Sequence, residues 1–147
     1  MKIVTITNAV HEIVELEWLK QSEAVHRQLR PQLPADYVGR MREVLGAGAD
    51  MAVGVRDHKV CGITVFRILE KTFSGRELYC DDLITDEALR SSGVGHALLR
   101  HMEAVAIERH CDFLGLDSGT QRQQAHKFYF REGLTVPAFH FSKPLKK

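Results

Sequence analysis

Residues 90–95 combine a cation, two hydroxyl groups and two glycines at a point where the sequence changes character. An apolar segment ends near Thr85, and a helical pattern begins after the glycines, so we expect a strand, a short polar connection and a helix. The first N–H groups of a helix lack intrahelical partners and carry partial positive charge, so they can hold a phosphate. Glycine allows close backbone approach, and Arg90 adds a full charge. The pattern favours a phosphate-binding loop, although Gly93 and Gly95 taken alone fit a simple turn equally well.

Two widespread phosphate-binding motifs do not fit this segment. The dinucleotide fingerprint G-x-G-x-x-G/A needs a small residue at position 98, where Leu98 stands. The Walker sequence G-x-x-x-x-G-K-[S/T] does not occur in the chain. Binding of NAD or ATP through this loop is therefore not expected.

Residues 90–95, Arg-Ser-Ser-Gly-Val-Gly, resemble the R/Q-x-x-G-x-G/A signature of the GNAT superfamily of N-acyltransferases. Residues 125–134, Ala-His-Lys-Phe-Tyr-Phe-Arg-Glu-Gly-Leu, are similar to a second motif of that family, A-x-x-(F/L)-Y-x-x-x-G-(F/L). The motifs start about 35 residues apart with the expected strand between them. Residues 1–75 resemble the family only in outline.

The resemblance implies an N-acetyltransferase that uses acetyl-CoA and holds no metal. Backbone amides of residues 90–95 would bind the coenzyme A pyrophosphate, and the pantetheine arm would pair with residues 83–85 as an extra strand does. The implied cofactor-binding residues are Leu83, Ile84, Thr85, Arg90, Ser91, Ser92, Gly93, Val94, Gly95, His96, Gln124 and Tyr129.

The chain departs from the family pattern at three places. Glu87 and Ser91 stand where many relatives carry proline and glycine. An asparagine common before the last helix is missing, and Gln121 or Gln124 is the available substitute.

The same resemblance assigns the catalytic roles. Tyr129 would direct its hydroxyl at the thioester sulfur, and a phenol with a pKa near 10 is still protonated at pH 7. Asp81 lies where several relatives carry a carboxylate facing the acceptor, so it is the candidate base, directly or through water. Strand alternation predicts that Asp81 and Asp82 project to opposite faces, with Asp82 paired to a basic side chain. His140 and Glu70 are weaker candidates for the base.

Hydrophobic periodicity and turn residues predict the elements that position these groups. Val94, Leu98, Met102 and Val105 recur at helical spacing, so one stripe of that helix should face a sheet. We expect strands at 2–7, 51–56, 60–69, 77–84, 113–117 and 135–142, and helices at 9–30, 35–45, 95–110 and 121–132. The order β-α-α-β-β-β-α-β-α-β predicts a mixed α/β fold with helices on both faces of the sheet. The resemblance adds a mostly antiparallel sheet that splays between the fourth and fifth strands.

Composition limits the classes of function. A chain of 147 residues suits a single domain over residues 1–147, and a net charge of +1 gives no reason to expect nucleic acid as a partner. No apolar run approaches the roughly 20 residues of a membrane span. The first residues lack the features of a signal peptide, so a cytoplasmic location is expected. Cys80 and Cys111 are expected to be buried, inert thiols and not acyl carriers.

The favoured function is transfer of an acetyl group from acetyl-CoA to a primary amine, by direct attack in a ternary complex. The alternative is a non-catalytic acyl-CoA-binding or sensing domain on the same fold. The acceptor is expected to be a small-molecule or peptide amine. An exposed last strand at 136–142 would allow a homodimer.

Overall fold

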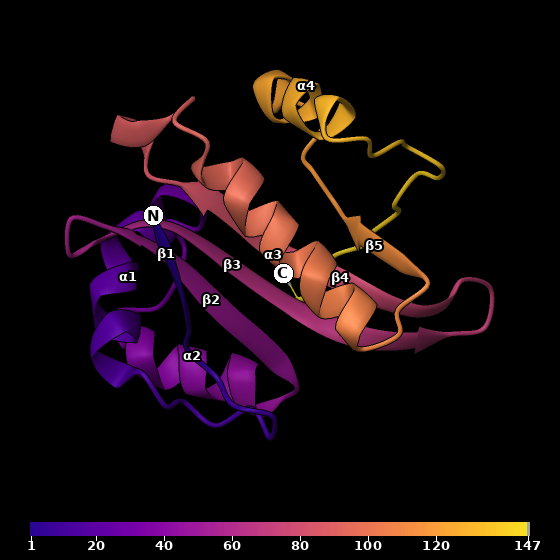
Figure 1. The fold of residues 1–147 in the computed structure, drawn as a ribbon. Coiled ribbons are helices and arrows are strands. Elements are labelled where there is room, and N and C mark those ends of the chain that lie inside the picture. Colours follow the sequence, from indigo (N-terminus) through magenta and orange to yellow (C-terminus); the bar gives the residue numbers. More distant parts are fainter. Residues whose placement is uncertain (147) are drawn as a thin grey trace. The chain divides into compact units, whose positions relative to one another are not determined.

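The computed structural model describes residues 1–146 and has the mixed α/β architecture predicted from the sequence (Figure 1). The chain clusters into two compact units, Met1–Leu116 and Asp117–Lys147. The first unit holds β1 (Lys2–Thr5), α1 (Leu16–Leu29), α2 (Tyr37–Gly46), β2 (Ala49–Arg56), β3 (Lys59–Lys71), β4 (Gly75–Thr85), the 3-10 turn η1 (Glu87–Leu89), α3 (Val94–Glu108) and β5 (Phe113–Leu116). The second unit holds α4 (Gln123–Arg131). That residues 1–147 act as a single domain stays a prediction.

The first unit is built on a five-stranded sheet in the order β1-β2-β3-β4-β5. Strands β1 to β4 are antiparallel neighbours, whereas β5 runs parallel to β4 because α3 carries the chain back between them. The β2–β3 hairpin turns at Asp57 and His58, whose φ angles of 52° and 61° suit the tight turn that right-twisted strands prefer. The predicted mostly antiparallel pairing is confirmed.

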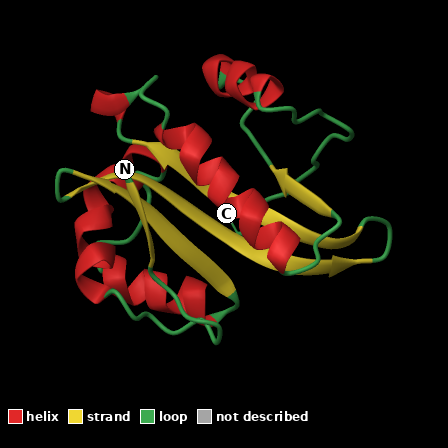
Figure 2. Cartoon of the chain, in the orientation of Figure 1, coloured by secondary structure: helices red, strands yellow, loops and turns green. Residues whose placement is uncertain are grey.

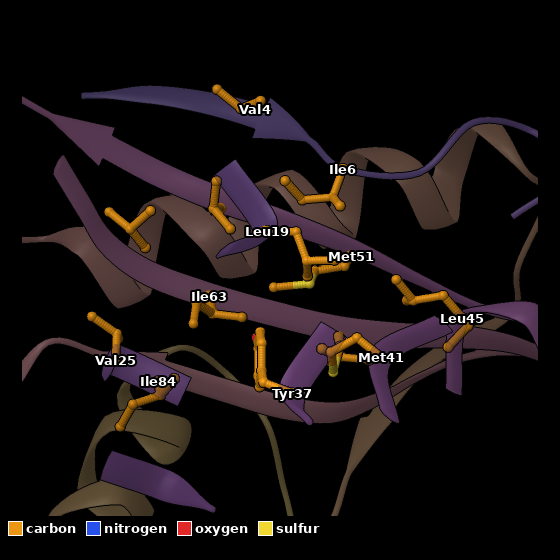
Figure 3. Packing of buried hydrophobic residues seen from close by; sticks show 14 of the residues in the cluster. Val4, Ile6, Leu19, Val25, Tyr37, Met41, Leu45, Met51, Ile63 and Ile84 are labelled. Atoms are coloured by element: carbon orange, nitrogen blue, oxygen red, sulfur yellow. The ribbon is translucent and has the colours of Figure 1, made fainter. Parts of the chain in front are cut away.

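Helices cover both faces of this sheet, as Figure 1 shows. Helices α1 and α2 pack on one face, where Leu19, Met41 and Ile63 belong to a buried cluster that Figure 3 shows from close by. Helix α3 packs on the other face and lies close to β3 at Gly62. A Cβ atom at that position would meet Val94 Cγ1 at 2.5 Å, so the missing side chain permits the close helix–strand approach.

The helix predicted from residue 9 begins only at Leu16. The Asn8 side chain accepts hydrogen bonds from the backbone N–H groups of Val10 and Glu12, and His11 has a φ angle of 63°. An asparagine bonded to its own following backbone stabilises a turn in competition with a helix. The amphipathic pattern correctly predicts a helix from Leu16 onward, and the predicted helix start at residue 9 is wrong.

The strand predicted over residues 135–142 is not formed. Figure 2 draws the chain beyond α4 as loop, and residues 132–146 hold no strand or helix. Pro137 has no N–H to give to a strand ladder, and Phe139 and Phe141 are 85% and 91% exposed. This prediction is wrong, and a dimer formed through that strand loses its structural basis. Gly133 has a φ angle of 91°, a left-handed conformation that suits a glycine just after a helix.

No helix in the described part of the chain is long and apolar enough to span a membrane.

Candidate functional site

The last residues of β4 extend beyond their parallel neighbour. Pairing with β5 covers only Glu77–Cys80, whereas pairing with β3 continues to Thr85. From Asp81 onward, β4 therefore has a strand partner in the first unit on one side only, and every second backbone N–H and C=O faces the other side. Residues 77–80 pair with the whole of β5, so the predicted splay can involve only residues 81–85, and the segment 83–85 keeps the polar edge that an extended ligand arm requires.

A tight loop follows β4 and leads into α3. Asp86 begins η1 and accepts a hydrogen bond from Ala88 N at 3.2 Å, and Ser92 Oγ donates to the Leu89 carbonyl. The φ angles of Ser91 and Gly93 are 64° and 85°, so the chain turns twice through the left-handed region before the helix starts. The glycine common at position 91 in relatives has a physical explanation here, because Ser91 adopts a backbone conformation that favours glycine.

Helix α3 begins without a side-chain cap at Val94. The first intrahelical bond at this end runs from Ala97 N to the Gly93 carbonyl. The N–H groups of Val94 and Gly95 precede that bond and point toward the helix start, where the helix dipole is positive. Arg90 is exposed beside them. The arrangement suits a phosphate, as the sequence predicts.

A β-bulge at Asp81 changes the faces of the neighbouring side chains. Val65 pairs with Asp82 and Phe66 pairs with Cys80, so Asp81 is an extra residue in β4. Val65 belongs to the cluster under α1 and α2, and Arg67 lies on the same face by alternation. Arg67 donates to both carboxylate oxygens of Asp81, and Asp82 contacts α1. The prediction that the two carboxylates lie on opposite faces is therefore wrong.

Asp82 ends a chain of buried polar contacts. Its Oδ2 atom lies 2.7 Å from His26 Nε2, and its Oδ1 atom accepts from Arg30 Nε at 2.8 Å. His26 Nδ1 in turn lies 2.8 Å from the Tyr37 hydroxyl. Burial alone would raise the pKa of Asp82, but the hydrogen bonds and charges of His26 and Arg30 lower it below its ordinary value of 3.8. The predicted basic partner of Asp82 is confirmed, and the carboxylate is ionised at neutral pH.

The sequence alone does not predict that His26 and Tyr37 are buried partners, although each is 1% exposed. Burial, together with the nearby charges of Glu23 and Asp82, raises the pKa of Tyr37 well above its ordinary value, so the phenol keeps its proton. A signal was available in the sequence. His26 falls on the same helical stripe as Leu19, where a polar residue indicates a buried partner.

Helix α4 places Tyr129 as its buried residue. Its ring lies 5.5 Å from that of Phe128, centroid to centroid, whereas Phe130 is 59% exposed. Gln124 lies in the first turn of α4. The roles predicted for Tyr129 and Gln124 stay predictions.

Other candidates have different surroundings. Glu70 is 69% exposed and pairs with Arg76 at the β3–β4 turn, and His140 is 66% exposed and lies 3.1 Å from Asp117 Oδ2. Burial raises the pKa of the Cys80 thiol to about 12, which confirms that this cysteine is buried and unreactive. Cys111 is only half-buried. Among residues 1–146, no cluster of three or more His, Cys, Asp or Glu side chains is suited to a metal ion.

Comparisons with known proteins bear on this geometry. A sequence model described as Acetyltransferase (GNAT) family matches residues 10–133. The uncharacterized N-acetyltransferase YhdJ of Bacillus subtilis (strain 168) is 29% identical over 135 residues, which cover 88% of this chain and 92% of that protein. The ribosomal-protein-alanine N-acetyltransferase of Brucella melitensis biovar Abortus 2308 superposes with a TM-score of 0.80 at 16% identity, covering 99% and 100% of the two chains. The aminoglycoside N-acetyltransferase AAC(6')-Iy in complex with CoA gives 0.82 at 15% identity, covering 99% and 95%.

Proposed function

Because the chain belongs to the acetyltransferase (GNAT) family and is an acyltransferase, we propose that it moves an acetyl group from acetyl-CoA to a primary amine. Acyl-CoA is the acyl donor of this family, and one structural relative was solved with CoA. The observation that carries the proposal is the one-sided edge of β4 from Asp81 onward, which leads directly into the left-handed loop that opens α3. An extended arm ending in a diphosphate needs these two features in this order.

The donor site follows from that observation. The diphosphate binds the N–H groups at the start of α3, with Arg90 supplying charge and Ser91, Ser92 and His96 lying beside it. The pantetheine arm then runs back along residues 83–85, which places the thioester near the Asp81 bulge. The motif match alone also assigns Gln124 and Tyr129 to the cofactor-binding residues.

The reaction is a direct attack within a ternary complex. An amine with a pKa of about 10.4 is protonated in all but roughly one molecule in two thousand at pH 7, so it must lose a proton first. Asp81, whose carboxylate accepts hydrogen bonds from Arg67 Nε, aids this loss through water. The free nitrogen attacks the carbonyl carbon, and the tetrahedral intermediate expels the sulfur with the bonding electron pair. Tyr129 donates a proton to that thiolate, and the attacking nitrogen loses its extra proton to solvent.

The acceptor class is not fixed by the fold. The two structural relatives carry names that refer to ribosomal-protein alanine and to aminoglycosides, which are a peptide amine and a small-molecule amine. Both classes fit the proposed reaction. A cytoplasmic location and a homodimer stay predictions.

A thiol-release assay over a broad panel of amines tests the proposed function. We expect CoA to be released in the presence of at least one amine class and not in its absence, since direct attack requires the acceptor. Tight acetyl-CoA binding without turnover on any amine would instead support the acyl-CoA sensor. Calorimetry with acetyl-CoA alone does not separate the two functions, because both bind the cofactor.

Replacing Arg90 with glutamine tests the donor site. We expect the affinity for acetyl-CoA to fall about tenfold, because a guanidinium–phosphate contact is charge-assisted and partly exposed. Turnover at saturating acetyl-CoA should change little. The matched control is Arg40→Gln on α2, an exposed arginine paired with Glu43, which should leave the affinity unchanged. Equal affinities of the two variants, measured by calorimetry, would remove Arg90 from the donor site.

A further inference from the structure

Each carboxylate at the Asp81 bulge pairs with a partly exposed guanidinium group. The Arg30 side chain is 40% exposed and its partner Asp82 is 13% exposed. The Arg67 side chain is 29% exposed and its partner Asp81 is 25% exposed. The two acidic side chains are neutralised one for one, so this end of β4 is not an acidic surface.

In both arginines, the Nη1 donors are not used by the contacts with Asp81 and Asp82. Arg30 uses Nε and Nη2 for Asp82 and for the Asp81 carbonyl, and Arg67 uses Nε and Nη2 for the Asp81 carboxylate. Among the contacts of the described residues, the Nη1 atom of neither arginine has a partner. Each Nη1 carries two N–H donors, and a guanidinium is the group best suited to a carboxylate.

A chain of hydrogen-bonded side chains holds Arg30 in place. The Tyr37 phenol keeps its proton, so it can donate to His26 Nδ1, which leaves the Nε2–H of His26 to donate to Asp82. Asp82 then fixes Arg30, and the Asp81 carbonyl fixes it a second time at 3.0 Å. A side chain fixed before binding loses less conformational entropy when a ligand arrives.

These observations bear on the acceptor, because the proposed donor path ends at the bulge. A polycationic amine would find no carboxylate available in Asp81 or Asp82, because each already pairs with an arginine. An amine with a carboxylate close to it would instead occupy the free donors and hold its nitrogen near the thioester. We propose that the acceptor is an amine that carries a neighbouring carboxylate, such as a free α-amino acid, and that Arg30 and Arg67 select it. This proposal rests on the proposed function.

A matched acceptor panel tests the proposal. Thiol release is measured with free α-amino acids, with the corresponding α-amides and with a polyamine. We expect kcat/KM for the acids to exceed that of the amides by about tenfold or more, the value of a charge-assisted contact. Intrinsic reactivity favours the amides, because an amino-acid amide has the more acidic ammonium group and therefore more free amine at pH 7. Arg30→Gln and Arg67→Gln should each lower the acid-to-amide ratio about tenfold, whereas Arg100→Gln, an exposed arginine paired with Glu103, should not.

A binding measurement separates failure of this proposal from failure of the proposed function. N-acetyl amino acids and their amides are titrated by calorimetry into protein saturated with CoA. Tighter binding of the acids, lost in Arg30→Gln, supports acceptor selection even if no amine releases thiol, and that result would overturn only the catalytic function. Turnover or binding that is equal or better with the amides or the polyamine overturns the proposal and leaves the acetyltransferase function standing.

Discussion

Replacing Tyr129 with phenylalanine is expected to lower turnover about 100-fold while leaving acetyl-CoA affinity unchanged. The change removes one hydroxyl group and keeps the ring, so the packing of the residue buried on α4 is preserved. A thiol with a pKa near 8.5 is a tolerable leaving group without a proton, so the loss should be partial. A factor of 100 corresponds to about 2.7 kcal/mol of transition-state stabilisation, within the usual contribution of one positioned acid.

Steady-state thiol release and calorimetry with acetyl-CoA measure the two quantities. The control is Phe130→Leu, which alters an exposed aromatic residue on the same helix and should change neither. Unchanged turnover of Tyr129→Phe would remove the phenol from the mechanism. A parallel loss of cofactor affinity would give it a binding role in place of an acid role.

The parts of the fold that follow local rules were predictable from the sequence. Helix α3 repeats its apolar stripe at Leu98 and Met102, and both side chains are fully buried. The turn at residues 57–58 and the glycine at position 133 lie where their backbone preferences indicate. The phosphate-binding loop was predicted for the same reason, since glycines between a strand and a helix have a local meaning.

The errors arose where tertiary contacts or single residues overrode a pattern. Residues 9–15 have helical amphipathicity, but the Asn8 side chain and the return of the chain to Ile6, whose carbonyl accepts from Val14 N, hold them in a turn. Residues 135–142 alternate like a strand, but Pro137 interrupts the donors that a ladder needs. Alternation thus predicted a strand whose backbone has no pairing in the structure.

Only part of the candidate site could be predicted from the sequence, again because tertiary contacts determine the rest. A β-bulge depends on how two strands pair, and nothing in the sequence around Asp81 marks one. Strand alternation without a bulge would place Asp81 and Asp82 on opposite faces of the sheet. Two arginines on one face would then not contact both carboxylates. His26 and Arg30 come from the C-terminal end of α1 and Arg67 comes from β3, so their convergence on β4 is a property of the folded chain.

Replacing Asp82 with alanine is expected to lower the free energy of unfolding at pH 7 by about 3 kcal/mol, because it leaves His26 without its hydrogen-bond acceptor and Arg30 without its counter-charge. The folded pKa of Asp82 lies below its ordinary value, so the unfolded chain binds the proton first as pH falls. The stabilisation by Asp82 is therefore fully present above about pH 4 and is lost as pH falls through the lower folded pKa.

Urea unfolding at pH 7 and at about pH 3 checks both the size and the sign of this effect. The deficit of Asp82→Ala should shrink at the lower pH, because protonation weakens the same contacts in the natural protein. Glu43→Gln alters an exposed carboxylate paired with Arg40 and should change stability by less than about 0.5 kcal/mol at either pH. A loss below about 1 kcal/mol at pH 7 would mean that the ion pairs of Asp82 barely exceed the cost of burying them. In that case the polar chain from Tyr37 to Arg30 would serve to position the guanidinium and not to stabilise the fold.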